Sequence, residues 1–86
     1  MASYEVKWKR SATKELKKIP KSKIPPLLKA VESLSQNPFP SGVKKLIGSD
    51  ITFRIRVGTY RIVYDLYNDE LIIEIIRVRH RKDVYE

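Results

Sequence analysis

The sequence contains no cysteine, a single histidine and no long apolar run. The absence of cysteine excludes disulfide bonds and thiolate chemistry, and one histidine leaves too few of the usual ligands for a metal site. The apolar run Leu71-Ile72-Ile73 stops at Glu74, far short of the roughly 20 apolar residues of a membrane span. No apolar stretch follows Met1, so no secretory signal is predicted. We therefore expect a cytoplasmic protein without membrane contact, metal or cofactor.

Acidic residues are few compared with basic ones. The chain has 10 Asp and Glu against 18 Lys and Arg, so its formal net charge is +8. A domain with that charge attracts polyanions, and the candidate partners are nucleic acid, an anionic membrane and an acidic protein segment. The 86 residues suffice for one core, so residues 1–86 are expected to form a single domain.

The hydrophobic pattern predicts an α+β fold. Apolar and polar residues alternate over residues 4–8, which indicates a first strand, and helical spacing follows on either side of Pro20. From Ile51 onward, alternation and turn residues predict three antiparallel strands. The expected order is β-α-α-β-β-β, with residues 45–47 as a candidate for one extra short strand. Both helices are expected on one face of a small antiparallel sheet.

Gly58-Thr59 separates two alternating runs and predicts a two-residue hairpin turn. The facing pairs on one side of this hairpin are then all apolar: Val57 with Tyr60, Ile55 with Ile62, and Phe53 with Tyr64. The other side carries Arg56 opposite Arg61, with Arg54 opposite Val63. Because like charges in facing positions are destabilising, this arrangement indicates a guanidinium cluster that binds an anion.

A second hairpin is expected to extend that face. If residues 67–70 form its loop, Leu66 faces Leu71. The residues that then join the arginine face are Glu74, Ile76, Val78 and His80. A loop that differs by one residue would place these four residues on the other face of the sheet. The pattern does not decide between the two, because the odd and the even positions of residues 71–78 are both apolar.

An arginine cluster suits RNA cleavage, because RNA carries its own nucleophile in the 2′-hydroxyl. The protein needs a base for the 2′ proton, cations for the charge that develops on phosphorus, and an acid for the departing 5′ oxygen. Arginine matches phosphate oxygens well but stays protonated. The base or acid is therefore sought among His80, Tyr85 and a lysine; Tyr85 would need a lowered pKa, and its ring is also suited to stacking on a base.

Two segments resemble the RelE family of bacterial and archaeal toxins. Residues Phe53 to Tyr64 resemble the family's central hairpin, and Val78 to Tyr85 resemble its C-terminal signature, a basic cluster that ends in Val-Tyr. The opening Tyr4-Glu5-Val6 and the Asn37-Pro38 after the second helical segment are also similar, so the resemblance covers nearly the whole chain.

This resemblance implies the toxin of a type II toxin–antitoxin system, which cleaves ribosome-bound messenger RNA without a metal and is neutralised by a cognate antitoxin. It implies that Arg61 grips the scissile phosphate, that Arg81 lies near the leaving group, and that Tyr85 orients or activates the nucleophile. Some family members have lysines where this chain has Arg54 and Arg56, so no lysine base is available there. The alternatives are a gyrase inhibitor of the related ParE type and an RNA-binding module without catalysis.

Two groups of candidate site residues follow from the register of the hairpin and from the family resemblance. The residues expected to act in catalysis are Arg54, Arg56, Arg61, His80, Arg81 and Tyr85. The residues expected to position RNA phosphates are Lys44, Lys45, Arg77, Arg79 and Lys82.

Overall fold

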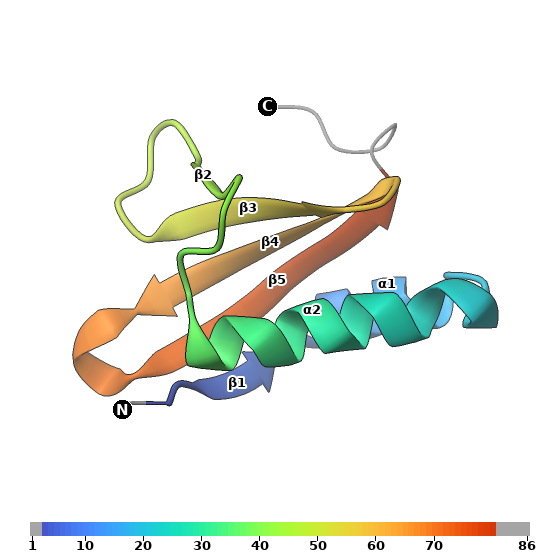
Figure 1. The fold of residues 1–86 in the computed structure, drawn as a ribbon, viewed down its shortest axis with the longest axis horizontal. Coiled ribbons are helices and arrows are strands. Elements are labelled where there is room, and N and C mark those ends of the chain that lie inside the picture. Colours follow the sequence, from blue (N-terminus) through green and yellow to red (C-terminus); the bar gives the residue numbers. More distant parts are fainter. Residues whose placement is uncertain (1–2, 81–86) are drawn as a thin grey trace.

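One mixed sheet and two helices make up the protein, whose computed structural model describes residues 3–80 (Figure 1). The strands are β1 (Glu5–Trp8), β2 (Lys44–Lys45), β3 (Thr52–Val57), β4 (Tyr60–Tyr67) and β5 (Ile72–His80). The helices are α1 (Arg10–Lys17) and α2 (Ile24–Gln36), and short 3-10 turns lie at Lys21–Lys23 and Asn68–Glu70. The α+β class expected from the sequence is confirmed.

The sheet is mixed, which corrects the expected antiparallel arrangement. Its strands lie in the order β1-β5-β4-β3-β2, and β1 runs parallel to β5 while the other neighbours are antiparallel. Parallel neighbours need a long crossover connection, so local turn signals do not reveal such a pair. The extra strand is Lys44–Lys45 and not residues 45–47, because Ile47 already belongs to the turn before β3. The observed order is therefore β-α-α-β-β-β-β.

Both helices bury apolar residues against one face of the sheet. Pro25 and Pro26 lie in the first turn of α2, where backbone amides have no helical acceptor and proline is tolerated. Tyr64 lies at the centre of the core, and its hydroxyl donates to the carbonyl of Pro38 at 2.6 Å. The buried core cluster comprises Ala12, Ile19, Leu27, Val31, Leu34, Ile55, Ile62, Tyr64, Leu66, Ile73, Ile75 and Val78.

The predicted hairpin between β3 and β4 is confirmed. Gly58 has a φ of 60°, a left-handed conformation that glycine adopts at little cost. The observed register places Arg56 opposite Arg61 and Arg54 opposite Val63. Because the pairs of the other parity are apolar and pack on the helices, the arginines of this hairpin lie on the opposite face of the sheet.

The predicted register between β4 and β5 is wrong. The turn includes Leu71, which has a φ of 55°, so Leu66 pairs with Ile73 and not with Leu71. A β-bulge follows where the register shifts between Val63 and Tyr64. Such a bulge places an extra residue on one strand and inverts the alternation beyond it.

The bulge decides which side chains of β5 reach each face. Val78 pairs with Ile62 and is 1% exposed, and His80 pairs with Tyr60 on the helix side of the sheet. The expectation that Val78 and His80 join the arginine face is therefore wrong, and Arg79 takes the position opposite Arg61. Burial of Val78 in the core provides the physical reason for this inverted parity.

Candidate functional site

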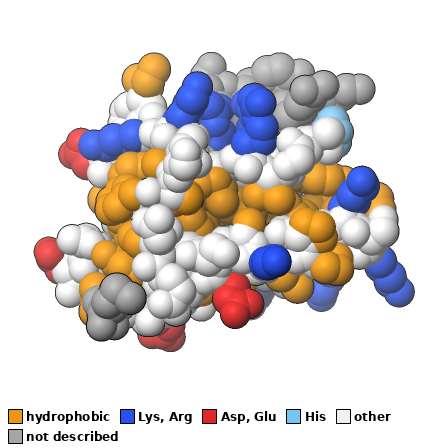
Figure 2. All heavy atoms as spheres, in the orientation of Figure 1, with side chains coloured by type: hydrophobic (Ala, Val, Ile, Leu, Met, Phe, Trp, Pro, Cys, Tyr) orange, Lys and Arg blue, Asp and Glu red, His pale blue; other side chains and the backbone are white. Residues whose placement is uncertain are grey.

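Four cationic side chains gather on the sheet face that the helices leave uncovered. Lys44, Arg54, Arg56 and Arg61 line, together with Gly42, a hollow of about 290 Å³, which we call the arginine hollow. Lys44 faces Arg54 across β2 and β3, and Arg56 faces Arg61 across β3 and β4. Figure 2 shows lysine and arginine side chains gathered along the top of the molecule, above the apolar core.

The guanidinium groups of the hollow influence one another electrostatically. Burial, followed by the nearby charges of Arg61 and Arg56, lowers the pKa of Arg54. Like charges in facing strand positions weaken a sheet, and an anion bound between them relieves that repulsion. The hollow is therefore suited to a phosphate group, whose oxygens match the planar arginine donors.

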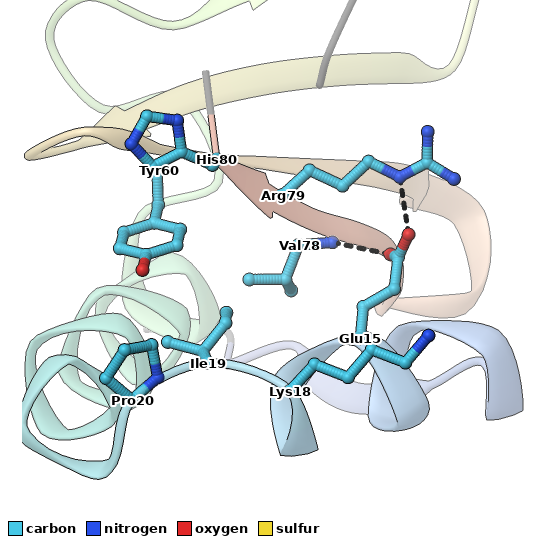
Figure 3. A pocket seen from close by; sticks show the side chains of 8 residues that line it. All are labelled: Glu15, Lys18, Ile19, Pro20, Tyr60, Val78, Arg79 and His80. Carbon is cyan, nitrogen blue, oxygen red and sulfur yellow. Dashed lines mark hydrogen bonds and ion pairs between the residues drawn. The ribbon is translucent and has the colours of Figure 1, made fainter. Parts of the chain in front are cut away.

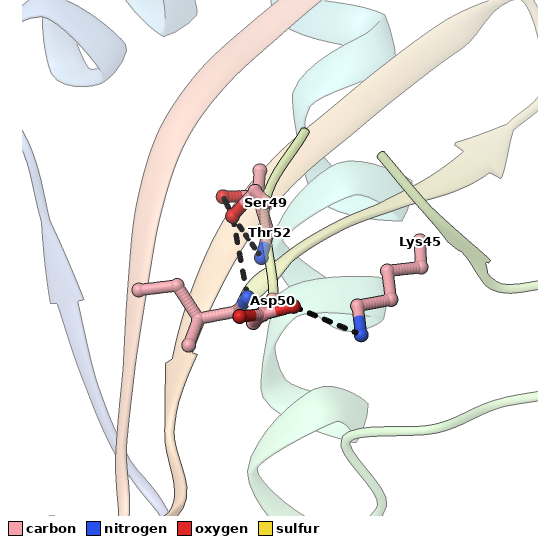
Figure 4. Close-up of polar contacts among 5 residues, drawn as sticks. Lys45, Ser49, Asp50 and Thr52 are labelled. Carbon is pink, nitrogen blue, oxygen red and sulfur yellow. Dashed lines mark hydrogen bonds and ion pairs between the residues drawn. The ribbon is translucent and has the colours of Figure 1, made fainter. Parts of the chain in front are cut away.

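Two of the predicted phosphate-binding residues lie beside the hollow without lining it. Lys45 follows Lys44 in β2, but its amino group lies 3.8 Å from the carboxylate of exposed Asp50 (Figure 4). Arg77 is exposed and faces Val63, so it lies on the same face of the sheet, one strand farther from the hollow. Of the five residues predicted to position phosphate, the structure brings only Lys44 into the lining among those within residues 3–80.

Arg79 and His80 lie at a second hollow, of about 380 Å³, between the end of α1 and the end of β5 (Figure 3). The guanidinium Nε of Arg79 donates to Glu15, so this cation already has an acidic partner. The ring of His80 packs edge-on against Tyr60, with centroids 5.5 Å apart at 79°. The structure therefore separates His80 from the arginine hollow by placing it on the helix side of the sheet.

The sequence reasoning overlooked Glu15. Its carboxylate accepts the backbone N–H of Val78 at 3.0 Å and the Nε of Arg79, and thereby joins α1 to β5. A signal was present, because Glu15 is the one acid within the basic helix from Arg10 to Lys17. Such an isolated acid is a candidate for a specific cationic or amide partner elsewhere in the fold.

Three predicted residues, Arg81, Lys82 and Tyr85, lie outside the described residues. Between residues 3 and 80, no cluster of three or more His, Cys, Asp or Glu side chains is positioned to hold a metal ion. Over the same span, neither helix has the length and apolar character that crossing a bilayer requires.

Comparison with known proteins places this fold in a defined class. Residues 6–85 match the family model described as the ParE toxin of the type II toxin-antitoxin system parDE. Toxin RelG of Mycobacterium tuberculosis is 34% identical over 90 residues, with 95% of each chain covered. These matches define a toxin of the RelE/ParE superfamily.

Solved structures narrow the assignment. The archaeal RelE–RelB complex from Pyrococcus horikoshii matches with a TM-score of 0.82 and 28% identity, covering 95% of this chain and 99% of the other. The RelBE2 toxin–antitoxin complex of M. tuberculosis matches with a TM-score of 0.82 and 30% identity, covering 96% and 97%. The chain belongs to the RelE family of type II toxins, as the resemblance of its two segments predicted.

Proposed function

We propose that this toxin is an endoribonuclease that cuts messenger RNA on the ribosome without a metal ion and so stops translation. The observation that carries the proposal is the convergence of Lys44, Arg54, Arg56 and Arg61 on one hollow. Ribosome dependence comes from the family resemblance. Because ribosomes and messages are cytoplasmic, the toxin acts in the cytoplasm.

The proposed reaction uses the nucleophile of the substrate. The 2′-hydroxyl gives its proton to a base and attacks the adjacent phosphorus, and the bond from phosphorus to the 5′ oxygen breaks as that oxygen takes a proton from an acid. The products carry a 2′,3′-cyclic phosphate and a 5′-hydroxyl. Arg61 grips the scissile phosphate, while Arg54 and Arg56 stabilise the charge that develops on its oxygens.

Proton transfer needs a group other than these arginines. His80 packs on Tyr60 on the helix side of the sheet, so we assign it no part in proton transfer. The proposal assigns orientation or activation of the nucleophile to Tyr85 and contact with the leaving group to Arg81, as the family resemblance implies. A Tyr85→Phe variant that still binds RNA but cuts it poorly would support this assignment of roles.

The test is to add antitoxin-free protein to translating ribosomes and to map the ends of the message. Wild-type protein should produce new 5′ ends within the decoding site, and Arg61→Ala should abolish them. Lys29→Ala is the matched control, because Lys29 is an exposed cation on α2, outside the hollow. Uncut message in the presence of folded wild-type protein would contradict the proposal.

Gyrase inhibition is the second candidate, because the matching family model is that of a ParE toxin. It predicts inhibition of DNA supercoiling with intact message, so a supercoiling assay run beside the ribosome assay separates the two functions.

We also propose a cognate antitoxin as the protein partner. Both of the solved structures described above are complexes of a toxin with its antitoxin. An acidic segment of such a partner would cover the arginine hollow and block RNA. Coexpression with the neighbouring gene product should restore growth and yield a stable complex.

A further inference from the structure

A second pocket, of about 320 Å³, adjoins the arginine hollow at the outer edge of β3, and we call it the edge pocket. It lies between α2, residues 40–42 and residues 55–57, and Gly42 and Arg56 line both the pocket and the hollow. The apolar part of its wall comprises Ala30, Leu34, Pro40, Ile55 and Val57. A charged group is therefore suited to the hollow, and a flat, less polar group to the edge pocket.

The backbone of β3 presents hydrogen-bonding groups to this pocket. Every second residue of β3 directs its peptide groups away from β4. Thr52 is one of them, and its carbonyl accepts the N–H of Leu46 at 2.9 Å. Arg54 follows in this series and lies opposite Lys44 of β2. Arg56 is the next member, so its peptide N–H and C=O also point outward.

The segment that pairs with β3 does not extend as far as Arg56. A longer β2 would place Gly42 there, but Gly42 has a φ of 85° and lies outside that strand. The N–H of Val43 donates back to the carbonyl of Pro40 at 3.1 Å instead. Within residues 3–80, the backbone bonds found outside the helices and strands include none at Arg56. One peptide donor and one peptide acceptor therefore lie open beside apolar walls.

The extent of this open edge indicates what binds there. An added protein strand bonds to several alternate residues of a sheet edge, whereas here Arg54 already faces Lys44 and Gly58 belongs to the turn. A nucleobase needs only one acceptor and one donor for its own hydrogen-bonding edge, and its ring fits between apolar walls. Because one sugar joins base and phosphate, two adjoining sites suit a single nucleotide.

We propose that the edge pocket binds a nucleobase of the message next to the phosphate in the arginine hollow, with the peptide N–H and C=O of Arg56 bonded to the edge of that base. All four bases carry a neighbouring donor and acceptor, so the pocket accepts any of them. This inference rests on the RNA-binding part of the proposed function and not on cleavage.

The test uses dinucleotides, whose single phosphate allows one register in the hollow. A 2′-deoxy first sugar prevents cutting. NMR titration of the protein amides gives the affinity for the intact dinucleotide and for two analogues, each of which lacks one base. Loss of one of the two bases should weaken binding about tenfold, and loss of the other should matter much less. The amide of Arg56 should shift with the intact dinucleotide and not with the weaker analogue.

Variants separate the base contact from the phosphate contact. Ala30→Leu narrows the edge pocket from α2 and should remove most of the preference for the intact dinucleotide. The slope of log K against log salt should stay at about 0.7, because the phosphate contact remains. Arg61→Ala should flatten this slope and weaken all three ligands alike. Gln36→Leu is the matched control, because it adds a leucine at an exposed position of α2 outside the pocket.

Equal affinities of the wild type for the three ligands overturn the inference, as does an Ala30→Leu variant that keeps the wild-type preference. If Ala30→Leu does not fold, Ser33→Leu replaces it, because Ser33 is exposed and lines the same pocket. Cutting of ribosome-bound message is measured separately. Base-dependent binding without cutting contradicts the proposed nuclease and supports the edge pocket, and cutting without base-dependent binding does the reverse.

Discussion

Glu15 joins helix α1 to the part of β5 that β1 leaves uncovered, and replacing it by alanine tests how this edge is held. β1 pairs with β5 only as far as Ile75. Farther along, Glu15 accepts the N–H of Val78 at 3.0 Å and the Nε of Arg79, with its own side chain 20% exposed. An uncovered strand edge is a liability that proteins protect, and here one carboxylate protects it.

The expected cost follows from these two contacts. A hydrogen bond to a charged group contributes ~1.5–3 kcal/mol, and an ion pair near the surface adds little. Since the site is partly open to water, we expect Glu15→Ala to lower the free energy of unfolding by ~2 kcal/mol. In a small domain this corresponds to a fall in melting temperature of roughly 8–16 °C. Glu15→Gln keeps a neutral acceptor for Val78 and should cost about half as much.

The same Glu15→Ala change should strengthen RNA binding although it weakens the fold. Loss of the carboxylate releases Arg79, which faces Arg61 across β4 and β5. The slope of log K for RNA binding against log salt should therefore steepen by about 0.7. Thermal melting by circular dichroism and RNA titrations measure the two effects. Glu32→Ala, an exposed acid of α2, is the control. An unchanged melting temperature in Glu15→Ala, or equal damage from glutamine and alanine, would refute the reasoning.

Three further predictions test other parts of the structure. Lys44→Ala should lower the slope of log K for RNA binding against log salt by about 0.7. Lys45→Ala should change this slope less, because Lys45 pairs with Asp50 outside the hollow. RNA titrations at several salt concentrations compare the two variants. Burial raises the pKa of Tyr64 to about 12. The stability that its neutral hydroxyl contributes is therefore complete below pH 10 and is lost as the pH rises toward 12. Urea unfolding from pH 9 to 12 should show this loss in the wild type and a weaker dependence of the unfolding free energy on pH in Tyr64→Phe. Gly58→Ala should destabilise by ~1–2 kcal/mol, because φ is 60° there, and an unaltered urea midpoint would contradict the turn geometry.

Arginines that face each other across two strands lower the stability of the sheet. Their position at the arginine hollow explains why the sequence keeps them. Arg56 and Arg61 occupy facing positions, where an oppositely charged or neutral residue would stabilise the sheet. Asp65 is available on the same face, yet it bonds to Thr52. The sheet thus brings three arginines and one lysine together at one hollow, an arrangement that suits phosphate binding.

Local sequence signals determined the hairpin that carries most of this hollow. Gly58 permits the tight turn, and the strict alternation on either side allows one register, because a slip by one residue would expose every apolar side chain. The convergence of Arg54, Arg56 and Arg61 was therefore predictable from the chain alone. The C-terminal signature likewise predicted the RelE family, which the comparisons show.

Only the tertiary structure decided what lies around that hairpin. Both parities of residues 71–78 are apolar, so the pattern could not indicate the bulge that buries Val78 and turns His80 to the helix side. The parallel pairing of β1 with β5 and the contacts of Glu15 join residues more than 60 positions apart. Packing of distant segments selects such contacts, since apolar burial against α1 and α2 favours one register of β5 that no local turn specifies.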